Sequence, residues 1–249
     1  MNWPYELQIG WRYARPGRSG QGGGFTSFIS AVSMVGIALG VAVLIIVLSV
    51  MNGFQKEVRN RMLAVISHIE ISDVDGPGFA GWRAAMATVG RDPDVTGAAP
   101  FVTAQALIGR GDILRGVVVR GIIPDEEARV SDLVAKLPAA TRQAISTGAG
   151  KVVLGIELAR SLGVVAGDRV TVVLPGGRAT SAGLLPRTRT LDVAGTFDAG
   201  HYEYDSTLAF VNLDDAAAMF QTGGPTGVQV RVKDMDDAPR VAARLERSM

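Results

Sequence analysis

Hydrophobic and polar residues are distributed unevenly along the chain, and the longest apolar run lies near the N-terminus. Residues 28–51 are apolar or small, and no charged side chain occurs from Ser19 to Gln55. About 20 apolar helical residues cross the hydrocarbon core of a bilayer. A buried core helix would be shorter and keep a polar face, and a signal peptide would have a shorter apolar region and a cleavage site. The pattern predicts a retained transmembrane helix over residues 25–52.

The segments on either side of this span have their own patterns. Residues 1–24 interleave Trp and Tyr with arginines, which is typical of a cytoplasmic or interfacial segment at the level of the lipid headgroups. After the span, apolar residues recur at helical spacing from Phe54 to Val65, which predicts a helical stalk over residues 53–67. Basic residues are balanced between the two flanks, so the positive-inside rule assigns no orientation.

Two groups of residues on the span carry predictions. Gly36 and Gly40 have the small-xxx-small spacing that lets a second helix approach closely, so they are predicted to be a helix-packing surface. Adaptable apolar side chains gather at the C-terminal end of the span, where they suit contact with flexible acyl chains. These are Val47, Val50, Met51 and Phe54. Ordinary lipid-facing surface is the alternative for this second group.

Downstream of the stalk, short strand-like and helix-like segments alternate, which predicts one mixed α/β domain over residues 68–249 in a chain of the α+β class. Strands are predicted at residues 68–72, 101–108, 116–121, 152–154, 170–174, 190–197, 208–211 and 227–232. Helices are predicted at residues 82–89, 131–145 with an interruption at Pro138, 156–162, 214–220 and from 237 onward. A strand, an Asp-rich turn and a helix occur at both ends of the domain, and such βα units share one sheet in ferredoxin-like folds. The strand-rich middle predicts a β-rich subdomain.

The segment from Pro175 to Arg189, which we call the hook, interrupts the strand pattern and is predicted to be a protruding loop. A connection of this length between two strands exceeds what a hairpin needs, and such loops are usually functional or disordered. An apolar anchor beside charge is the usual arrangement at the centre of a protein interface. The hook residues of this kind are Leu184, Leu185, Pro186, Arg187 and Arg189. A mobile tip without a partner is the alternative.

Composition excludes several functional classes. The chain has no cysteine, which excludes disulfides, thiolate metal sites and a cysteine nucleophile. A net charge of +1 over 249 residues provides no overall attraction to nucleic acid. Two histidines and the absence of a G-x-S-x-G motif leave no constellation for hydrolysis. We therefore expect neither enzymatic activity nor a cofactor.

Two motifs imitate chemical sites. Gly148–Lys151 is similar to the end of a phosphate-binding loop, but Ile145 and Val152 stand where that motif needs Gly and Ser or Thr. His201, Glu203 and Asp205 alternate, so on a strand they would share one face and could hold a metal ion. A polar strand face that buries Tyr202 and Tyr204 on its other side is the favoured interpretation.

Nine segments in order along the chain resemble the permease subunits of the bacterial lipoprotein-releasing ABC transporter, the LolC/LolE family. They are Trp11-Arg12-Tyr13, Phe25 to Ser30, Gly36 to Ala42, Leu48 to Phe54, Val153 to Ala159, Leu162 to Val164, Gly167 to Thr171, Gly195 to Phe197 and Tyr202 to Ser206. The resemblance lies in their order and spacing across nearly the whole chain. The wider superfamily includes macrolide-efflux and cell-division permeases, with a related MacB-like periplasmic core.

This resemblance implies a bacterial inner-membrane protein with its N-terminus in the cytoplasm and its α/β domain in the periplasm. It also implies a complex that lifts lipoproteins out of the membrane and passes them to the periplasmic carrier LolA. ATP hydrolysis would belong to a separate subunit, and a second permease copy or a paralogue would complete the complex. The hook would bind LolA, and the residues from Val47 to Phe54 would contact lipoprotein acyl chains and membrane lipid.

One departure from the family concerns the C-terminal end of the chain. Family members carry three further membrane helices after the periplasmic domain, and the helical pattern here reaches Met249 without a capping residue. We therefore expect either a fragment or a truncated product. The alternative from a different functional class is a single-pass membrane-anchored scaffold whose domain only binds a protein partner.

Overall fold

A computed structural model of the chain describes Tyr5, Ile9 and residues 23–63, 68–73, 76–148, 150–180 and 183–249. The chain divides into two compact units, Met1–Arg59 and Asn60–Met249. Most of the predicted interfacial segment, and the stalk from residue 64 to residue 67, lie outside the described residues.

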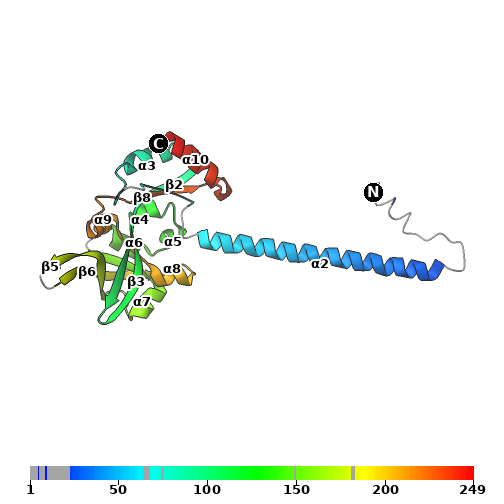
Figure 1. Cartoon of the computed structure of the whole chain (residues 1–249), viewed down its shortest axis with the longest axis horizontal. Helices are drawn as coiled ribbons and strands as arrows, with labels where there is room; N and C mark the ends of the chain where they lie inside the picture. The colour runs from blue at the N-terminus through cyan, green and yellow to red at the C-terminus, as the bar shows by residue number, and fades with distance from the viewer. Residues whose placement is uncertain are drawn as a thin grey trace. The chain divides into compact units, whose positions relative to one another are not determined.

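Most of the first unit is one long helix, α2 (Gly23–Leu63), which runs from blue to cyan in Figure 1 and ends a few residues beyond Arg59. Its 41 residues correspond to a helix of about 60 Å, twice the thickness of a bilayer core. The part from Phe28 to Gln55 is long and apolar enough to cross a membrane, and none of it is buried within the chain. Leu, Ile and Val side chains at successive positions cover all sides of this helix with apolar surface, as a lipid environment requires.

The second unit is built on one eight-stranded sheet in the order β1-β8-β2-β3-β7-β4-β6-β5 (Figure 1). The strands are β1 (Ile69–Ser72), β2 (Val95–Arg110), β3 (Ile113–Ile122), β4 (Lys151–Gly155), β5 (Arg169–Thr180), β6 (Gly183–Phe197), β7 (Leu208–Asn212) and β8 (Gly227–Val232). Since β2 also pairs with β5, the six strands from β2 to β5 in this order close into a barrel.

Strand β2 belongs to both parts of the sheet. Its N-terminal half, from Val95 to Phe101, pairs with β8, and its C-terminal residues Leu107–Gly109 pair with β5. The three strands β1, β8 and β2 therefore form an open sheet that continues into the barrel through a single long strand.

Two helices cover the open sheet. Helix α3 (Trp82–Val89) follows β1, and α10 (Ala238–Ser248) follows β8 and the short 3-10 helix η1 (Met235–Asp237). The two helices contact each other and pack on β1 and β8 around a separate apolar core (Figure 1, top). The prediction that the two βα units share one sheet is confirmed, with β1 antiparallel to β8.

The remaining helices surround the barrel. They are α4 (Pro124–Glu127), α5 (Asp132–Ala135), α6 (Ala139–Ser146), α7 (Ile156–Leu162), α8 (Tyr202–Thr207) and α9 (Leu213–Phe220). The predicted break at Pro138 separates α5 from α6, because this residue is the N-cap of α6. Gly163 ends α7 in the left-handed conformation, with φ 64° and ψ 36°, which confirms its prediction as a C-cap.

Two sequence-based expectations about local structure are wrong. The hook is not a loop, because β5 continues to Thr180 and β6 begins at Gly183. The segment with His201, Glu203 and Asp205 is not a strand either, because α8 begins at Tyr202. The buried Asp205 carboxylate accepts hydrogen bonds from the backbone N–H groups of Ala199 (2.7 Å) and His201 (3.2 Å), and these bonds hold the turn that starts the helix.

Candidate functional site: a projecting β-ribbon

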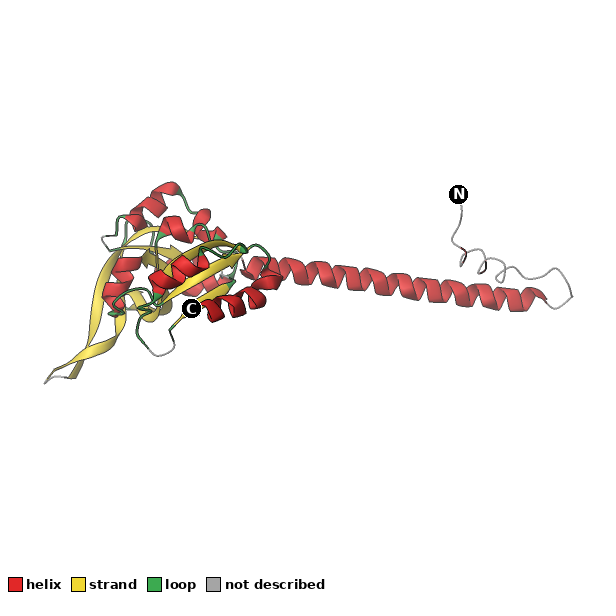
Figure 2. Cartoon of the chain, turned by 90° about the horizontal axis from the view of Figure 1, so that it is seen from above, coloured by secondary structure: helices red, strands yellow, loops and turns green. Residues whose placement is uncertain are grey.

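The hook forms the outer part of a long hairpin made by β5 and β6. The two strands pair continuously from Arg169 opposite Asp192 to Thr180 opposite Gly183, apart from one irregularity after Leu174. Pairing of β5 with β2 ends at Val173, and pairing of β6 with β4 begins at Asp192. Between these points and the tip, the described residues of each strand pair only with the other strand. This two-stranded part, residues 174–180 and 183–190, is the ribbon, which extends from the barrel in Figure 2.

The glycine and proline residues of the ribbon lie at positions where they do not interrupt the hydrogen bonds between β5 and β6. Gly176 has φ 78° and lies at the irregularity between Leu174 and Gly177, where one strand carries extra residues. The backbone N–H of Asp192 points away from β5 and donates to the carbonyl of Gly150 at 2.8 Å. In an antiparallel ladder, every second residue of a strand has its N–H on the same side. The nitrogen of Pro186 therefore also points away from β5, to the outer edge of β6. The same alternation turns the nitrogen of Pro175 to the other outer edge. Neither proline removes a hydrogen bond between β5 and β6.

The ladder places the predicted hook residues individually. Leu184 and Leu185 pair with Ala179 and Arg178 near the tip. Pro186 is exposed opposite Gly177, and Arg189 is exposed opposite Val172. The structure therefore brings all five hook residues onto one strand of the ribbon.

Arg187 differs from the other hook residues because its guanidinium is already engaged. The side chain is half-buried, and Nη2 donates a hydrogen bond to the backbone carbonyl of Met219 in α9 at 3.0 Å. This contact joins residues 32 positions apart in the chain. Sequence patterns gave no indication of it.

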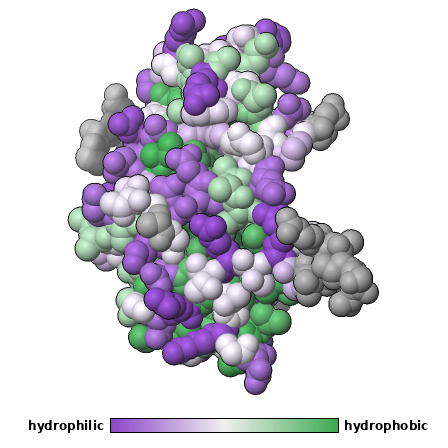
Figure 3. Space-filling view, turned by 90° about the vertical axis from the view of Figure 1, so that its left-hand side faces the viewer, coloured by the Kyte–Doolittle hydropathy of each residue, from purple (hydrophilic) through white to green (hydrophobic). Residues whose placement is uncertain are grey.

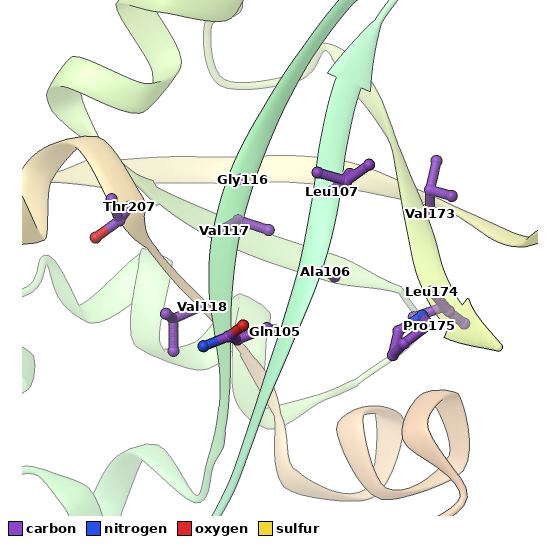
Figure 4. A pocket seen from close by; sticks show the side chains of 10 residues that line it. All are labelled: Gln105, Ala106, Leu107, Gly116, Val117, Val118, Val173, Leu174, Pro175 and Thr207. Atoms are coloured by element: carbon purple, nitrogen blue, oxygen red, sulfur yellow. The ribbon is translucent and has the colours of Figure 1, made fainter.

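An open apolar depression of about 520 Å³ lies at the base of the ribbon (Figure 4). It is lined by Gln105, Ala106, Leu107, Gly116, Val117, Val118, Val173, Leu174, Pro175 and Thr207. Leu107 is 45% exposed and lies between Gly116 of β3 and Val173 of β5. A side chain at Gly116 would meet nothing within 4 Å, so the surface is open there. The sequence feature that could have indicated this depression is the run of apolar residues at consecutive positions of β2 and β3, which puts apolar side chains on both faces of these strands.

The surface of the second unit is mixed. On the side shown in Figure 3, hydrophobic residues lie in separate patches among polar ones. Exposed large apolar side chains in the described part of this unit include Leu107, Ile113, Leu114 and Val165. Isolated apolar residues of this kind are common on protein surfaces.

The predicted residues of the membrane span all lie on α2. Val47, Val50, Met51 and Phe54 are each more than half exposed, and their spacing of i, i+3, i+4 and i+7 puts them on one side of the helix. Gly36 and Gly40 continue this same side toward the N-terminus, because 36, 40, 43, 47, 50 and 54 follow steps of three and four. An added side-chain carbon at either glycine would meet nothing within 4 Å.

The imitation of a phosphate-binding loop is occupied by the protein itself. The backbone N–H of Gly150 donates to the Asp215 carboxylate at 3.0 Å, and Lys151 Nζ lies 3.5 Å from the Asp192 carboxylate. These groups would otherwise face a phosphate. In the ranges that the structure describes, no group of three or more His, Asp or Glu side chains is placed to hold a metal ion.

One buried polar cluster was not anticipated from the sequence. Glu127 is 2% exposed and accepts a hydrogen bond from Gln229 Nε2. Arg120 Nη2 donates to Gln229 Oε1 at 2.6 Å, and its Nε lies 4.0 Å from Glu127. Burial raises the pKa of Glu127, against the opposing effects of Arg120 and Gln229. The cluster joins β3, β8 and α4 at the meeting of the open sheet and the barrel.

The chain combines an apolar helix long enough to cross a membrane with a mixed α/β sheet domain that carries a projecting ribbon. Residues 30–248 match the model of a protein family described as the MacB-like periplasmic core domain, and the chain belongs to this family.

The curated relatives specify the resemblance further. The chain is 41% identical over 242 residues to the lipoprotein-releasing system transmembrane protein LolC of Xylella fastidiosa, covering 97% of this chain and 57% of that protein. It is 39% identical over 241 residues to LolC of Neisseria meningitidis serogroup B, covering 96% of this chain and 57% of that protein. It is 30% identical over 253 residues to LolE of Haemophilus influenzae, covering 100% and 58%. The resemblance to the LolC/LolE family is thus confirmed, and the chain spans little more than half the length of these relatives.

Proposed function

We propose that this chain acts as a membrane permease subunit in a complex that extracts lipoproteins from the inner membrane and hands them to the periplasmic carrier LolA. The observation that carries the proposal is the 41% identity to LolC across 97% of the chain, which includes both the membrane helix and the sheet domain. In this arrangement the N-terminus is cytoplasmic and the sheet domain is periplasmic. ATP hydrolysis belongs to a separate subunit, and a second permease completes the assembly.

In this proposal the ribbon captures the carrier. A narrow two-stranded projection can enter a concave partner, and its length comes from main-chain pairing between β5 and β6. Exposed Pro186 and Arg189 on β6, with Leu184 and Leu185 beside them, supply a rigid and a charged element next to aliphatic residues. Arg187 is assigned a different part below, since its guanidinium bonds to α9.

One side of α2 has two functions in this proposal, one after the other along the helix. This side carries Gly36 and Gly40, and then the cluster from Val47 to Phe54. The glycines permit close packing against another membrane helix. The bulkier residues seven and more positions further along hold neighbouring helices apart and leave apolar space for acyl chains. A chamber lined by this end of α2 is therefore part of the proposed route for the lipid-modified end of the substrate.

Binding of purified LolA to the full chain in lipid nanodiscs tests the docking proposal. The variant Leu185→Asp/Arg189→Glu inverts the apolar and basic character of the ribbon while it leaves Arg187 and its contact with α9 in place. We expect affinity to fall by at least about tenfold, because truncating a central anchor has an effect of this size. Biolayer interferometry gives the dissociation constant.

The matched control is Leu114→Asp/Arg115→Glu, the same change at exposed residues of the β2–β3 hairpin. It should bind LolA as the wild type does. Equal affinity of the ribbon variant and the wild type would mean that the carrier docks elsewhere.

A further inference from the structure

One hydrogen bond outside the β5–β6 ladder joins the base of the ribbon to helix α9. Arg187 pairs with Leu174, at the point where β5 has lost β2 as a neighbour and where the ladder becomes irregular. Residues directly opposite in an antiparallel pair have their side chains on the same face. Leu174 is 6% exposed in the barrel core, so Arg187 extends from the face of the ribbon that continues the barrel interior.

Helix α9 presents an acceptor to this guanidinium. The last carbonyl groups of a helix have no partner within it and carry the negative end of the helix dipole. Gln221 ends α9 in the left-handed conformation, and its N–H bonds to the carbonyl of Ala217. The carbonyl of Met219 receives Arg187 Nη2 at 3.0 Å. A cation at this position is favourable both as a donor and as a charge.

The helix that receives Arg187 is itself firmly held. Asn212 caps its N-terminus, because its side-chain oxygen accepts the N–H of Asp214 at 2.9 Å, and its Nδ2 donates to the carbonyl of Ile145 at 3.1 Å. Met219 is 4% exposed in the barrel core. A hydrogen bond from the ribbon to α9 therefore restricts the motion of the base of the ribbon relative to the barrel core.

We propose that Arg187 is a positioning residue that braces the ribbon against the C-terminus of α9 and thereby holds it in the orientation in which the carrier docks. The inference rests on the proposed function, since it deepens the account of the same docking site. Without the brace, the ribbon is a two-stranded structure that leaves the barrel next to an irregular, glycine-containing step. Two-stranded ribbons of this kind are marginally stable alone.

Hydrogen exchange on the full chain in nanodiscs, combined with LolA binding, tests the brace. In Arg187→Met, which keeps the aliphatic stem, the ribbon amides should exchange about tenfold faster while those of β3 and β7 stay unchanged, since a charge-assisted bond is lost. LolA affinity should fall by about the same factor. Arg187→Lys, which retains a cationic donor, should recover a large part of both. Unchanged β3 and β7 exchange shows that the variants fold.

Arg115→Met is the matched control, because Arg115 also donates to a carbonyl, that of its neighbour Leu114 at 3.0 Å, but on another hairpin. It should alter neither measurement. Unchanged ribbon exchange in Arg187→Met would overturn the brace, and faster exchange with unchanged affinity would overturn its role in docking. If the wild type binds no LolA, the proposed function and the docking role fail together, while ribbon exchange still decides whether the brace exists.

Discussion

Glu127 shows what burial does to a single ionisable residue. Its carboxyl group is 2% exposed, and desolvation raises its pKa from the ordinary value of 4.5, although Arg120 and Gln229 favour the charged form. The folded protein therefore keeps a proton on Glu127 at pH values at which the unfolded chain has released it. Between the unfolded and the raised folded pKa, the folded state binds more protons, so this residue's contribution to stability falls as pH rises.

This sign gives a prediction for Glu127→Gln, which cannot ionise. Relative to the wild type, the variant should gain in free energy of unfolding as pH rises from about 4 to about 8, because only the wild type must then either bury a carboxylate or take up a proton on folding. Urea denaturation of both proteins across this range measures the difference. Glu246→Gln, at an exposed position of α10, should follow the wild type throughout. Parallel curves for Glu127→Gln and the wild type would contradict the assignment.

At the scale of elements, local pattern and structure agree where the deciding contacts are local. Helix α3 and strand β8 have the bounds that periodicity predicts, because apolar spacing sets which side is buried. The end of α7 at Gly163 was predictable for the same reason, since the left-handed conformation is a property of one residue.

The ribbon was mispredicted because its deciding contacts are not local, and α8 was mispredicted because short-range bonds from a side chain to the backbone outweigh a strand-like pattern. Pro175 and Pro186 lie in the segment that was predicted to be a loop, yet both have their nitrogens at free edges of the ribbon, which becomes evident only when the register is known. The alternation from His201 to Asp205 imitates a strand, whereas the Asp205 carboxylate bonds to the backbone before α8. The contact of Arg187 with Met219 spans 32 residues, and no sequence pattern encodes it.

The glycines of α2 provide a prediction at the scale of a helix. Under the proposed function, Leu at both Gly36 and Gly40 should weaken assembly with the second permease and the ATPase subunit, because bulky side chains keep helix backbones apart. Co-purification from membranes through a tag on this chain measures it. Gly53→Leu is a control on a different side of α2 and should have little effect. Full recovery of the partners with the double variant would exclude these glycines as a packing surface.

At the scale of the whole molecule, the periplasmic-type unit is two subdomains built around one strand. β2 is 16 residues long and serves the open sheet with one half and the barrel with the other. The cluster of Arg120, Glu127 and Gln229 lies where the two subdomains meet. A force applied at the ribbon is therefore transmitted to the open sheet through a continuous strand and a buried polar contact rather than through a flexible linker.

The two prolines at the edges of the ribbon, Pro175 and Pro186, also affect whether the protein aggregates at high local concentration. A projecting ribbon with two free edges is a template on which strands of other molecules can assemble, and proline is one of the residues that blocks such growth. Replacing both, as Pro175→Val/Pro186→Thr, restores an N–H on each edge and should promote self-association, detectable by sedimentation velocity of the detergent-solubilised chain. The control Thr188→Val changes a ribbon side chain without adding a backbone donor and should remain monodisperse. A monodisperse double variant would mean that the prolines have no protective effect. By this argument, the projection that would expose the ribbon to the proposed carrier also makes it a site of aggregation, and the prolines oppose the aggregation.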